Sequence, residues 1–206
     1  NVFEHFHPVL PDSYRSTPTV FLANIHPDLQ HEVLDAVDRP RLVVADTMNL
    51  WIDITRESLM RLLPRLDVLV INDEEARLLS GEWSLPAAIR AVAGMGPKAL
   101  VVKKGEHGAI LAEARDHDLF LTPAFPLDTI VDPTGAGDSF AGGFVGHLAR
   151  LGHAPSTHDL RRAMVIGTVV ASFTVEGVGV SSLAAASAEA MNTRLDEFQR
   201  MLRIAE

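Results

Sequence analysis

Short apolar runs alternate with amphipathic segments through the first half of the chain. Short runs dominated by apolar residues are typical of buried strands, and they occupy residues 20–23, 41–46, 67–72 and 99–102. Apolar residues at helical spacing occupy the segments between them, at residues 29–37, 54–63, 74–79 and 85–93. Buried strands that alternate with helices predict an α/β fold, with a mostly parallel central sheet covered on both faces.

The pattern changes after residue 102. Apolar runs at 109–112 and 119–122 flank a polar stretch, 113–118, which predicts an antiparallel hairpin. Three helical segments follow, at residues 137–151, 158–174 and 187–204. No repeat or internal linker interrupts the chain, so we expect residues 1–206 to form a single domain.

Composition and charge narrow the range of partners. The chain has 206 residues, is 47% hydrophobic and carries a net charge of −9 without a dense Lys/Arg block. This size suits one domain with a real core, whereas the charge argues against nucleic acid or an anionic membrane as the main partner. A phosphate group would have to be bound by backbone amides and a few well-placed lysines.

Cysteine is absent, which excludes disulfides, thiolate metal sites and thiol nucleophiles. This is compatible with a reducing cytoplasm, and a cytoplasmic location is our expectation. No apolar run reaches the roughly 18 residues that a membrane span needs. The first residues do not resemble a signal peptide, and because the chain begins without Met we expect it to start within a longer protein.

The most informative segment runs from Asp132 through Pro133, Thr134, Gly135, Ala136 and Gly137 to Asp138. Proline ends the extended stretch, and a helix with Phe140, Phe144 and Leu148 on one face begins just after it. The glycines therefore lie at a helix N-terminus, where free N–H groups and the helix dipole favour an anion. Glycine also lets this backbone approach a ligand closely.

Asp138 falls in the first turn of this helix, where the dipole favours an ionised carboxylate. A carboxylate beside a phosphate-sized anion hole suits transfer of a phosphoryl group to a hydroxyl, because one group accepts the proton while amides hold the phosphoryl oxygens. The alternative is that Asp138 caps the helix and the glycines only form a turn.

The run from Asp132 to Phe140 resembles the second signature of the ribokinase/PfkB carbohydrate kinase family, with Pro133 where Thr is usual. The resemblance implies a ribokinase-like three-layer α/β sandwich that uses ATP and Mg²⁺ to phosphorylate a sugar or nucleoside. It implies that Asp138 is the catalytic base and that the amides of Gly135, Ala136 and Gly137 form the anion hole.

Two further segments match the family in order. Asn72 and Glu75 resemble its Asn-x-x-Glu motif, which organises Mg²⁺, water and phosphates; an acid-rich helix start is the alternative. Lys103, Gly105 and Gly108 lie in a segment similar to the family's nucleotide-contacting turn, although a hairpin turn with exposed lysines gives the same pattern.

Residues 175–181 resemble the family's loop beside the adenine, with the 158–174 helix as the other wall. The resemblance implies nucleotide contacts from Val175 and Gly177. In members that bind a monovalent cation such as K⁺, this loop supplies ligands. The implied set comprises Asp132, Thr134 and Ser181 with carbonyls near Ser172, Val175 and Gly177.

Family members are about a third longer, and their N-terminal region holds a Gly-Gly sugar signature and a lid, neither of which this chain shows. Most sugar contacts would come from that part. Asp46 ends a strand on the side of the sheet where ligands bind, and it either contacts substrate or caps the next segment. A homodimer stays open, because family members often associate through the lid.

Other functions were weighed. No Walker P-loop or Gly-x-Gly-x-x-Gly motif is present, which disfavours a Walker-type NTPase and a dinucleotide-binding oxidoreductase.

Gly137-Asp138-Ser139-Phe140 resembles the nucleophile block of Gly-Asp-Ser-Leu esterases. In those esterases the Asp/His pair follows the serine block, whereas Asp28 and His31 precede it here. A non-catalytic nucleotide-binding module is the other alternative. The early histidines, with irregular spacing, favour structural roles over a metal site.

Overall fold

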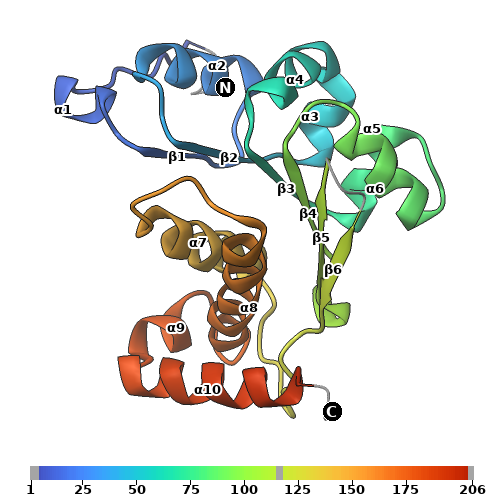
Figure 1. Cartoon of the computed structure of the whole chain (residues 1–206), viewed down its shortest axis with the longest axis vertical. Helices are drawn as coiled ribbons and strands as arrows, with labels where there is room; N and C mark the ends of the chain where they lie inside the picture. The colour runs from blue at the N-terminus through green and yellow to red at the C-terminus, as the bar shows by residue number, and fades with distance from the viewer. Residues whose placement is uncertain (1–4, 115–117, 204–206) are drawn as a thin grey trace. The chain divides into compact units, whose positions relative to one another are not determined.

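The computed structural model describes residues 5–114 and 118–203. It contains a six-stranded sheet in which the strands follow chain order (Figure 1). The strands are β1 (Thr19–Leu22), β2 (Leu42–Asp46), β3 (Val68–Asn72), β4 (Ala99–Lys103), β5 (Ala109–Glu113) and β6 (Leu119–Thr122). The α/β fold predicted from the apolar runs is confirmed, with each predicted strand within about one residue of its place.

The chain divides into two compact units, Asn1–Val102 with Ala112–Asp118 and Lys103–Leu111 with Leu119–Glu206. In the first unit, β1 pairs in parallel with β2, and β2 with β3, so that Val20 lies opposite Val43 and Val44 opposite Val68. All five residues of β2 are buried, which explains its apolar run from Leu42 to Ala45. Because the strands run in parallel, their carboxyl ends meet at one edge of the sheet.

The helices of the first unit are α1 (Asp12–Arg15), α2 (Pro27–Ala36), α3 (Asn49–Ile54), α4 (Arg56–Leu62), α5 (Asp73–Ser80) and α6 (Leu85–Ala93), with a 3-10 turn at Leu63–Arg65. The single helix predicted at 54–63 is wrong at its start. Thr55, at φ −132°, separates α3 from α4, and α4 begins only at Arg56. Gly81 ends α5 in the left-handed conformation at φ 76°, which glycine adopts without strain.

The second unit contains a 3-10 turn η2 (Gly105–His107) and four helices: α7 (Ala136–Ala149), α8 (Thr157–Thr174), α9 (Ser181–Ala185) and α10 (Ala188–Met201). The pattern predicted α7, α8 and α10 but not the short α9. The tip of the predicted 113–118 turn lies outside the described residues. Across the described part of the chain, no helix combines the length and apolar character needed to traverse a bilayer.

Helices α7 and α8 approach each other closely through two glycines. A Cβ atom on Gly143 of α7 would lie 2.8 Å from Val170 Cγ2, and one on Gly167 of α8 would lie 2.8 Å from the Phe140 carbonyl oxygen. Real Cβ atoms do not come this close to other atoms, so only glycine permits the observed spacing. The buried rings of Phe140 and Phe144 stack beside this contact at 6.3 Å between centroids.

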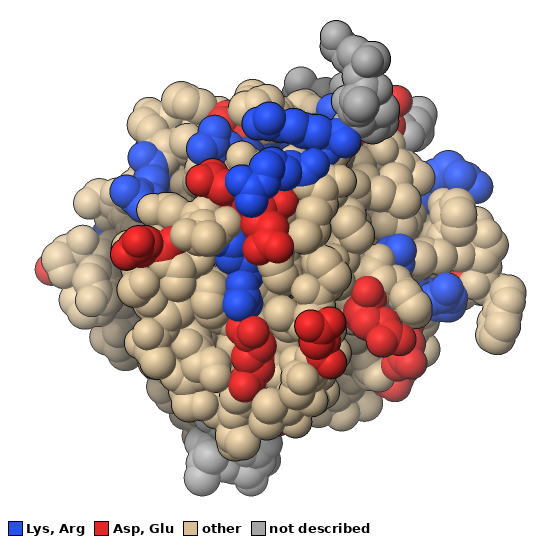
Figure 2. Space-filling model, turned by 90° about the horizontal axis from the view of Figure 1, so that it is seen from below, with Lys and Arg blue, Asp and Glu red and all other residues tan. Residues whose placement is uncertain are grey.

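Charged side chains of both signs occur on the face shown in Figure 2, with wide uncharged areas between them. Basic and acidic side chains stand next to each other on this face. This mixture of signs agrees with a sequence that has a net charge of −9 and no dense Lys/Arg block.

Candidate functional site

The N-terminus of α7 carries the predicted catalytic segment. Gly135 is the N-cap at φ 83°, and the Ala136 N–H donates to the Pro133 carbonyl oxygen at 3.1 Å. Within the described part of the chain, the backbone N–H groups of Gly135, Gly137 and Asp138 have no hydrogen-bond acceptor. Asp138 is exposed in the first turn, and the described residues offer its carboxylate no hydrogen bond or ion pair. A helix start therefore presents unsatisfied donors beside an accessible carboxylate.

Lys103, at the end of β4, brings a positive charge to this helix start. Its Nζ lies 3.3 Å from the position that a Cβ atom on Gly137 would occupy. A Cβ atom on Gly137 would press on the ammonium group, which would have to move by a few tenths of an ångström. The ammonium group and the helix dipole act in the same direction and favour an anion there.

The residues before α7 are joined to the 175–181 loop. The Val175 carbonyl oxygen accepts hydrogen bonds from Val131 N–H at 2.8 Å and Asp132 N–H at 3.3 Å. The Thr134 backbone N–H and hydroxyl, together with the Gly179 N–H, lower the pKa of the Asp132 carboxyl below its usual value. A lowered pKa means that ionised Asp132 stabilises this junction, and that the stabilisation is lost as the pH falls through the carboxyl's pKa in the folded protein.

The other residues implied for a monovalent cation lie in the same unit. The Ser181 hydroxyl donates to the Val178 carbonyl oxygen at 2.8 Å, and a Cβ on Gly177 would meet Ser182 Oγ at 2.2 Å and Ser181 Oγ at 2.9 Å. Gly177 thus lets the loop fold back on the start of α9. These oxygens have the hard character that K⁺ prefers, and the Val175 carbonyl is already engaged with residues 131 and 132.

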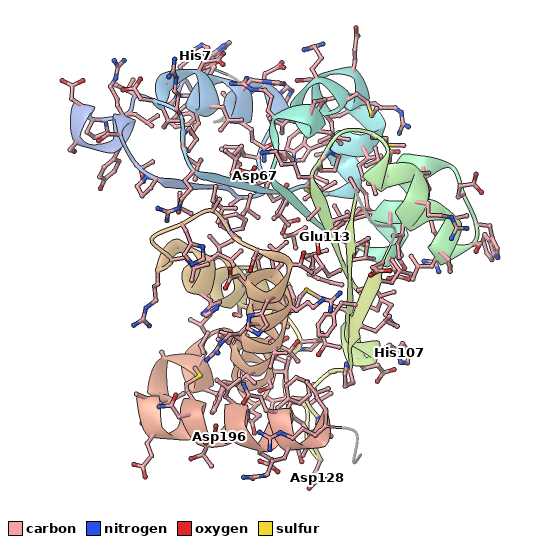
Figure 3. The ribbon with its side chains drawn as sticks, in the orientation of Figure 1. His7, Asp67, His107, Glu113, Asp128 and Asp196 are labelled. Atoms are coloured by element: carbon pink, nitrogen blue, oxygen red, sulfur yellow. The ribbon has the colours of Figure 1, made fainter. Side chains whose placement is uncertain are left out.

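The turn at Gly105–His107 joins β4 to β5 (Figure 3 labels His107 there). Lys104 N–H donates to the Gly108 carbonyl oxygen at 2.7 Å, and Gly105 and Gly108 have φ values of 55° and 81°. A Cβ on Gly108 would lie 2.0 Å from the Thr122 carbonyl oxygen, whereas one on Gly105 would meet nothing within 4 Å. Gly108 is therefore required by packing against the end of β6, and Gly105 only by its backbone conformation.

Asn72 and Glu75 form a capping box at the start of α5 in the first unit. Asn72 Oδ1 accepts from the Glu75 N–H at 2.7 Å, and Glu75 Oε2 accepts from the Asn72 N–H at 2.8 Å. The alternative reading, a helix start enriched in acids, thus describes their local structure. Among the described residues, no three His, Asp or Glu side chains converge on a metal position. A role for Asn72 and Glu75 in organising Mg²⁺ stays a prediction from the family resemblance.

Asp46 lies at the carboxyl end of β2 and is 6% exposed. Its Oδ1 accepts from the Thr47 N–H at 2.8 Å, and its carbonyl oxygen accepts from Gln30 Nε2 at 3.2 Å. The side chain thus closes the turn that follows β2. A neighbouring pair was not predicted: the Trp51 indole N–H donates to Asn24 Oδ1 at 2.8 Å, with Asn24 following β1.

Two hollows in the first unit lie away from the predicted site residues. One, of about 370 Å³, is bordered by Arg90, Gly96 and Lys98, and the other, of about 260 Å³, by Arg41, Arg65 and Asp67. Asp67 directly precedes β3 (Figure 3).

Ser139 does not have the surroundings of a nucleophile. It is 9% exposed, and its Oγ accepts a hydrogen bond from the Thr174 hydroxyl at 2.7 Å. In the first unit, His31 Nε2 contacts the Ser58 carbonyl oxygen and its Nδ1 contacts Arg65. A buried serine whose partner is threonine lacks the general base that an esterase needs, which disfavours that alternative.

Curated proteins that are similar in sequence to this chain include sugar and nucleoside kinases. The chain is 30% identical over 145 residues to a cytidine kinase of Thermococcus kodakarensis, covering 68% of this chain and 51% of the relative. It is 25% identical over 178 residues to a nucleoside kinase of Methanocaldococcus jannaschii, covering 85% and 54% respectively. The chain thus spans about half the length of these relatives.

Solved structures show the same fold. The crystal structure of the Methanocaldococcus jannaschii nucleoside kinase, titled an archaeal member of the ribokinase family, matches with a TM-score of 0.73 at 22% identity, over 95% of this chain and 60% of that one. An aminoimidazole riboside kinase from Salmonella enterica matches with a TM-score of 0.69 at 21% identity, over 89% and 67%. The pfkB family carbohydrate kinase model matches residues 32–186, which include the Asp132–Asp138 segment and most of both units, and the chain therefore belongs to this family of kinases.

Proposed function

We propose that the protein transfers the γ-phosphoryl group of ATP to a hydroxyl group of a sugar or nucleoside. The observation that carries this proposal is the start of α7, where exposed Asp138 stands beside the unsatisfied N–H groups of Gly135 and Gly137 and near the Lys103 ammonium group. A proton acceptor and a cluster of anion-stabilising donors at one helix start are what phosphoryl transfer requires.

The reaction proceeds in line and in one step. The Asp138 carboxylate accepts the proton of the acceptor hydroxyl as that oxygen bonds to the γ-phosphorus, and the bond from the γ-phosphorus to the β–γ bridging oxygen breaks to release ADP. Amides at the α7 start, with Lys103, stabilise the charge on the phosphoryl oxygens. Mg²⁺, when bound, would neutralise the phosphate charge, and the family resemblance makes Asn72 and Glu75 the residues that would help to hold it.

Residues 103–108 and 175–181 flank the nucleotide in this proposal. Asp46 is the candidate acceptor contact, together with Asn24, which follows β1, and its hydrogen-bond partner Trp51 of α3. The names of the relatives set the order in which acceptors are tested, because they include cytidine, nucleoside, adenosine and deoxyribose kinases and a 6-phosphofructokinase.

A panel of acceptors tests the proposal. The protein at its full natural length is incubated with ATP and Mg²⁺ and with cytidine, adenosine, ribose, deoxyribose, fructose or fructose 6-phosphate, in K⁺ and in Na⁺ buffers, and the phosphorylated product is measured. We expect phosphorylation of at least one acceptor, and faster turnover in K⁺ if Asp132, Thr134 and Ser181 hold a cation. ATP binding without any product would favour a non-catalytic module, and absence of ATP binding would refute the proposal.

Lys103 provides a second test. Exchanging Lys103 for Met removes the charge beside Gly137 but keeps an apolar stem, and we expect kcat/KM for ATP to fall by about tenfold to a hundredfold, since one stabilising donor is lost. Lys98→Met is the matched control, because Lys98 precedes the same strand and its Nζ contacts Asp67 at 2.6 Å. Equal steady-state constants for Lys103→Met and Lys98→Met would show that the Lys103 charge plays no part.

A further inference from the structure

Arg194 of α10 contacts a carboxylate, a hydroxyl group and two aromatic rings at once. Its guanidinium group donates to both carboxylate oxygens of Glu176, at 2.7 and 3.2 Å, and to the Ser172 hydroxyl at 3.0 Å. The side chain is only 18% exposed, so water screens this ion pair less than it would a surface pair. Two parallel N–H bonds to one carboxylate also fix its orientation, which a single bond does not.

Two phenyl rings hold the guanidinium group in place. Its Cζ lies 3.7 Å from the centroid of the Phe173 ring and 5.1 Å from that of Phe125. Phe125 also contacts the fully buried Phe198, at 5.7 Å between centroids, which ties the ring to the core of this unit. A planar cation against aromatic rings is attracted by them and loses little freedom on binding. Arg194 is therefore a rigid anchor point.

Arg194 holds Glu176, which lies at the start of the 175–181 loop. Glu176 directly follows Val175, whose carbonyl oxygen accepts from the N–H groups of residues 131 and 132, just ahead of the α7 start. Fixing Glu176 thus fixes both the direction of the loop and the position of that carbonyl oxygen. Without its partner, the Glu176 carboxylate would also be an uncompensated negative charge in a loop that flanks the negatively charged nucleotide in the proposed function.

We propose that Arg194 is a positioning residue for nucleotide binding: by pairing with Glu176 it holds the 175–181 loop in its nucleotide-binding conformation. This inference rests on the proposed kinase function, and it concerns a residue outside every segment that resembles the family signatures. Arg194 acts through Glu176 and does not touch the nucleotide. Its loss should therefore change the KM for ATP and leave the chemical step unchanged.

The experiment compares steady-state constants for five forms of the full-length protein: wild type, Arg194→Ala, Arg194→Lys, Glu176→Gln and the Arg194→Ala/Glu176→Gln double variant. For Arg194→Ala we expect the KM for ATP to rise about tenfold, with kcat within twofold and the acceptor KM unchanged. Arg194→Lys keeps the positive charge but cannot form two parallel hydrogen bonds to Glu176. Its KM for ATP should therefore lie between those of the wild type and Arg194→Ala. The double variant should bind ATP more tightly than Arg194→Ala, because it no longer carries an unpaired carboxylate.

Arg200→Ala is the matched control, since Arg200 is an exposed arginine of the same helix. Amide hydrogen exchange of residues 175–181 without nucleotide should increase in Arg194→Ala and not in Arg200→Ala. If Arg194→Ala does not fold, Glu176→Gln, which keeps the arginine on its rings, carries the test, with an expected rise of about threefold in the KM for ATP.

Two negative outcomes are distinguishable. If the wild type binds ATP and the Arg194 and Glu176 variants bind it equally well, the positioning role is refuted while the proposed function stands, even if the variants melt at lower temperature. If the wild type binds no ATP, the proposed function and this inference both fail.

Discussion

Replacement of Asp138 by Asn is expected to lower kcat by about a thousandfold while the affinity for ATP stays within about threefold of wild type. Asparagine has the same shape but cannot take up the acceptor proton, and general-base catalysis contributes about 10² to 10⁴ in rate. The amides at the α7 start, which would hold the phosphates, are unaffected because the Asp138 side chain makes no hydrogen bond to a described residue. Steady-state turnover together with calorimetric titration of ATP measures both quantities.

Ser139→Ala is the control for this prediction because it changes the adjacent residue. It removes the hydrogen-bond partner of the buried Thr174 hydroxyl, so we expect a loss of about 1 to 2 kcal/mol in the free energy of unfolding. Turnover should remain within about threefold of wild type. A collapse of activity in Ser139→Ala as large as that in Asp138→Asn would contradict the assignment of the base and favour a serine nucleophile.

Gly108→Ala is expected to destabilise the fold by about 3 kcal/mol. The new methyl group would lie 2.0 Å from the Thr122 carbonyl oxygen and 2.5 Å from the Pro123 carbonyl carbon, and φ is 81°. Both neighbours are backbone atoms that cannot rotate away, so a steric cost adds to the cost of a left-handed alanine. For a chain of this size the melting temperature should fall by about 6 to 12 °C, which differential scanning calorimetry would detect.

Gly105→Ala separates the two contributions. Gly105 lies in the same turn at φ 55°, but its Cβ position has no neighbour within 4 Å, so only the backbone cost of about 1 to 2 kcal/mol applies. Equal melting temperatures for Gly105→Ala and Gly108→Ala would contradict this prediction. They would mean that the backbone at the end of β6 moves aside at little cost when a methyl group is added at Gly108.

The sequence predicted the sheet well because burial on both faces makes β2 and β3 continuously apolar. It predicted less well where a helix is short or lacks a side-chain cap. Helix α3 begins after Met48 without a side-chain cap and is only six residues long, and α9 has five residues and no buried side chain. Such segments leave no periodic signal that distinguishes them from loops.

For the candidate site, the start of α7 could be predicted because all of its parts are adjacent in the chain. The approach of Lys103 to Gly137 could not, since these residues are distant in sequence and no local pattern brings them together. Arg194 left no signal either, because an arginine in an amphipathic helix usually faces solvent. The alternative to a magnesium role for Asn72 and Glu75 was a helix start enriched in acids. The structure shows a capping box there, and its hydrogen bonds do not exclude the magnesium role.

The glycine contacts between α7 and α8 limit how the molecule can respond to a ligand. Because Gly143 and Gly167 leave no free space between the helices, α7 cannot rotate or slide without carrying α8 with it. In the proposed reaction, the Asp138 carboxylate on α7 would therefore keep a fixed direction relative to α8. Any closure around a bound molecule must therefore come from elements other than this pair, and variants that loosen the helix contact should trade catalytic accuracy for mobility.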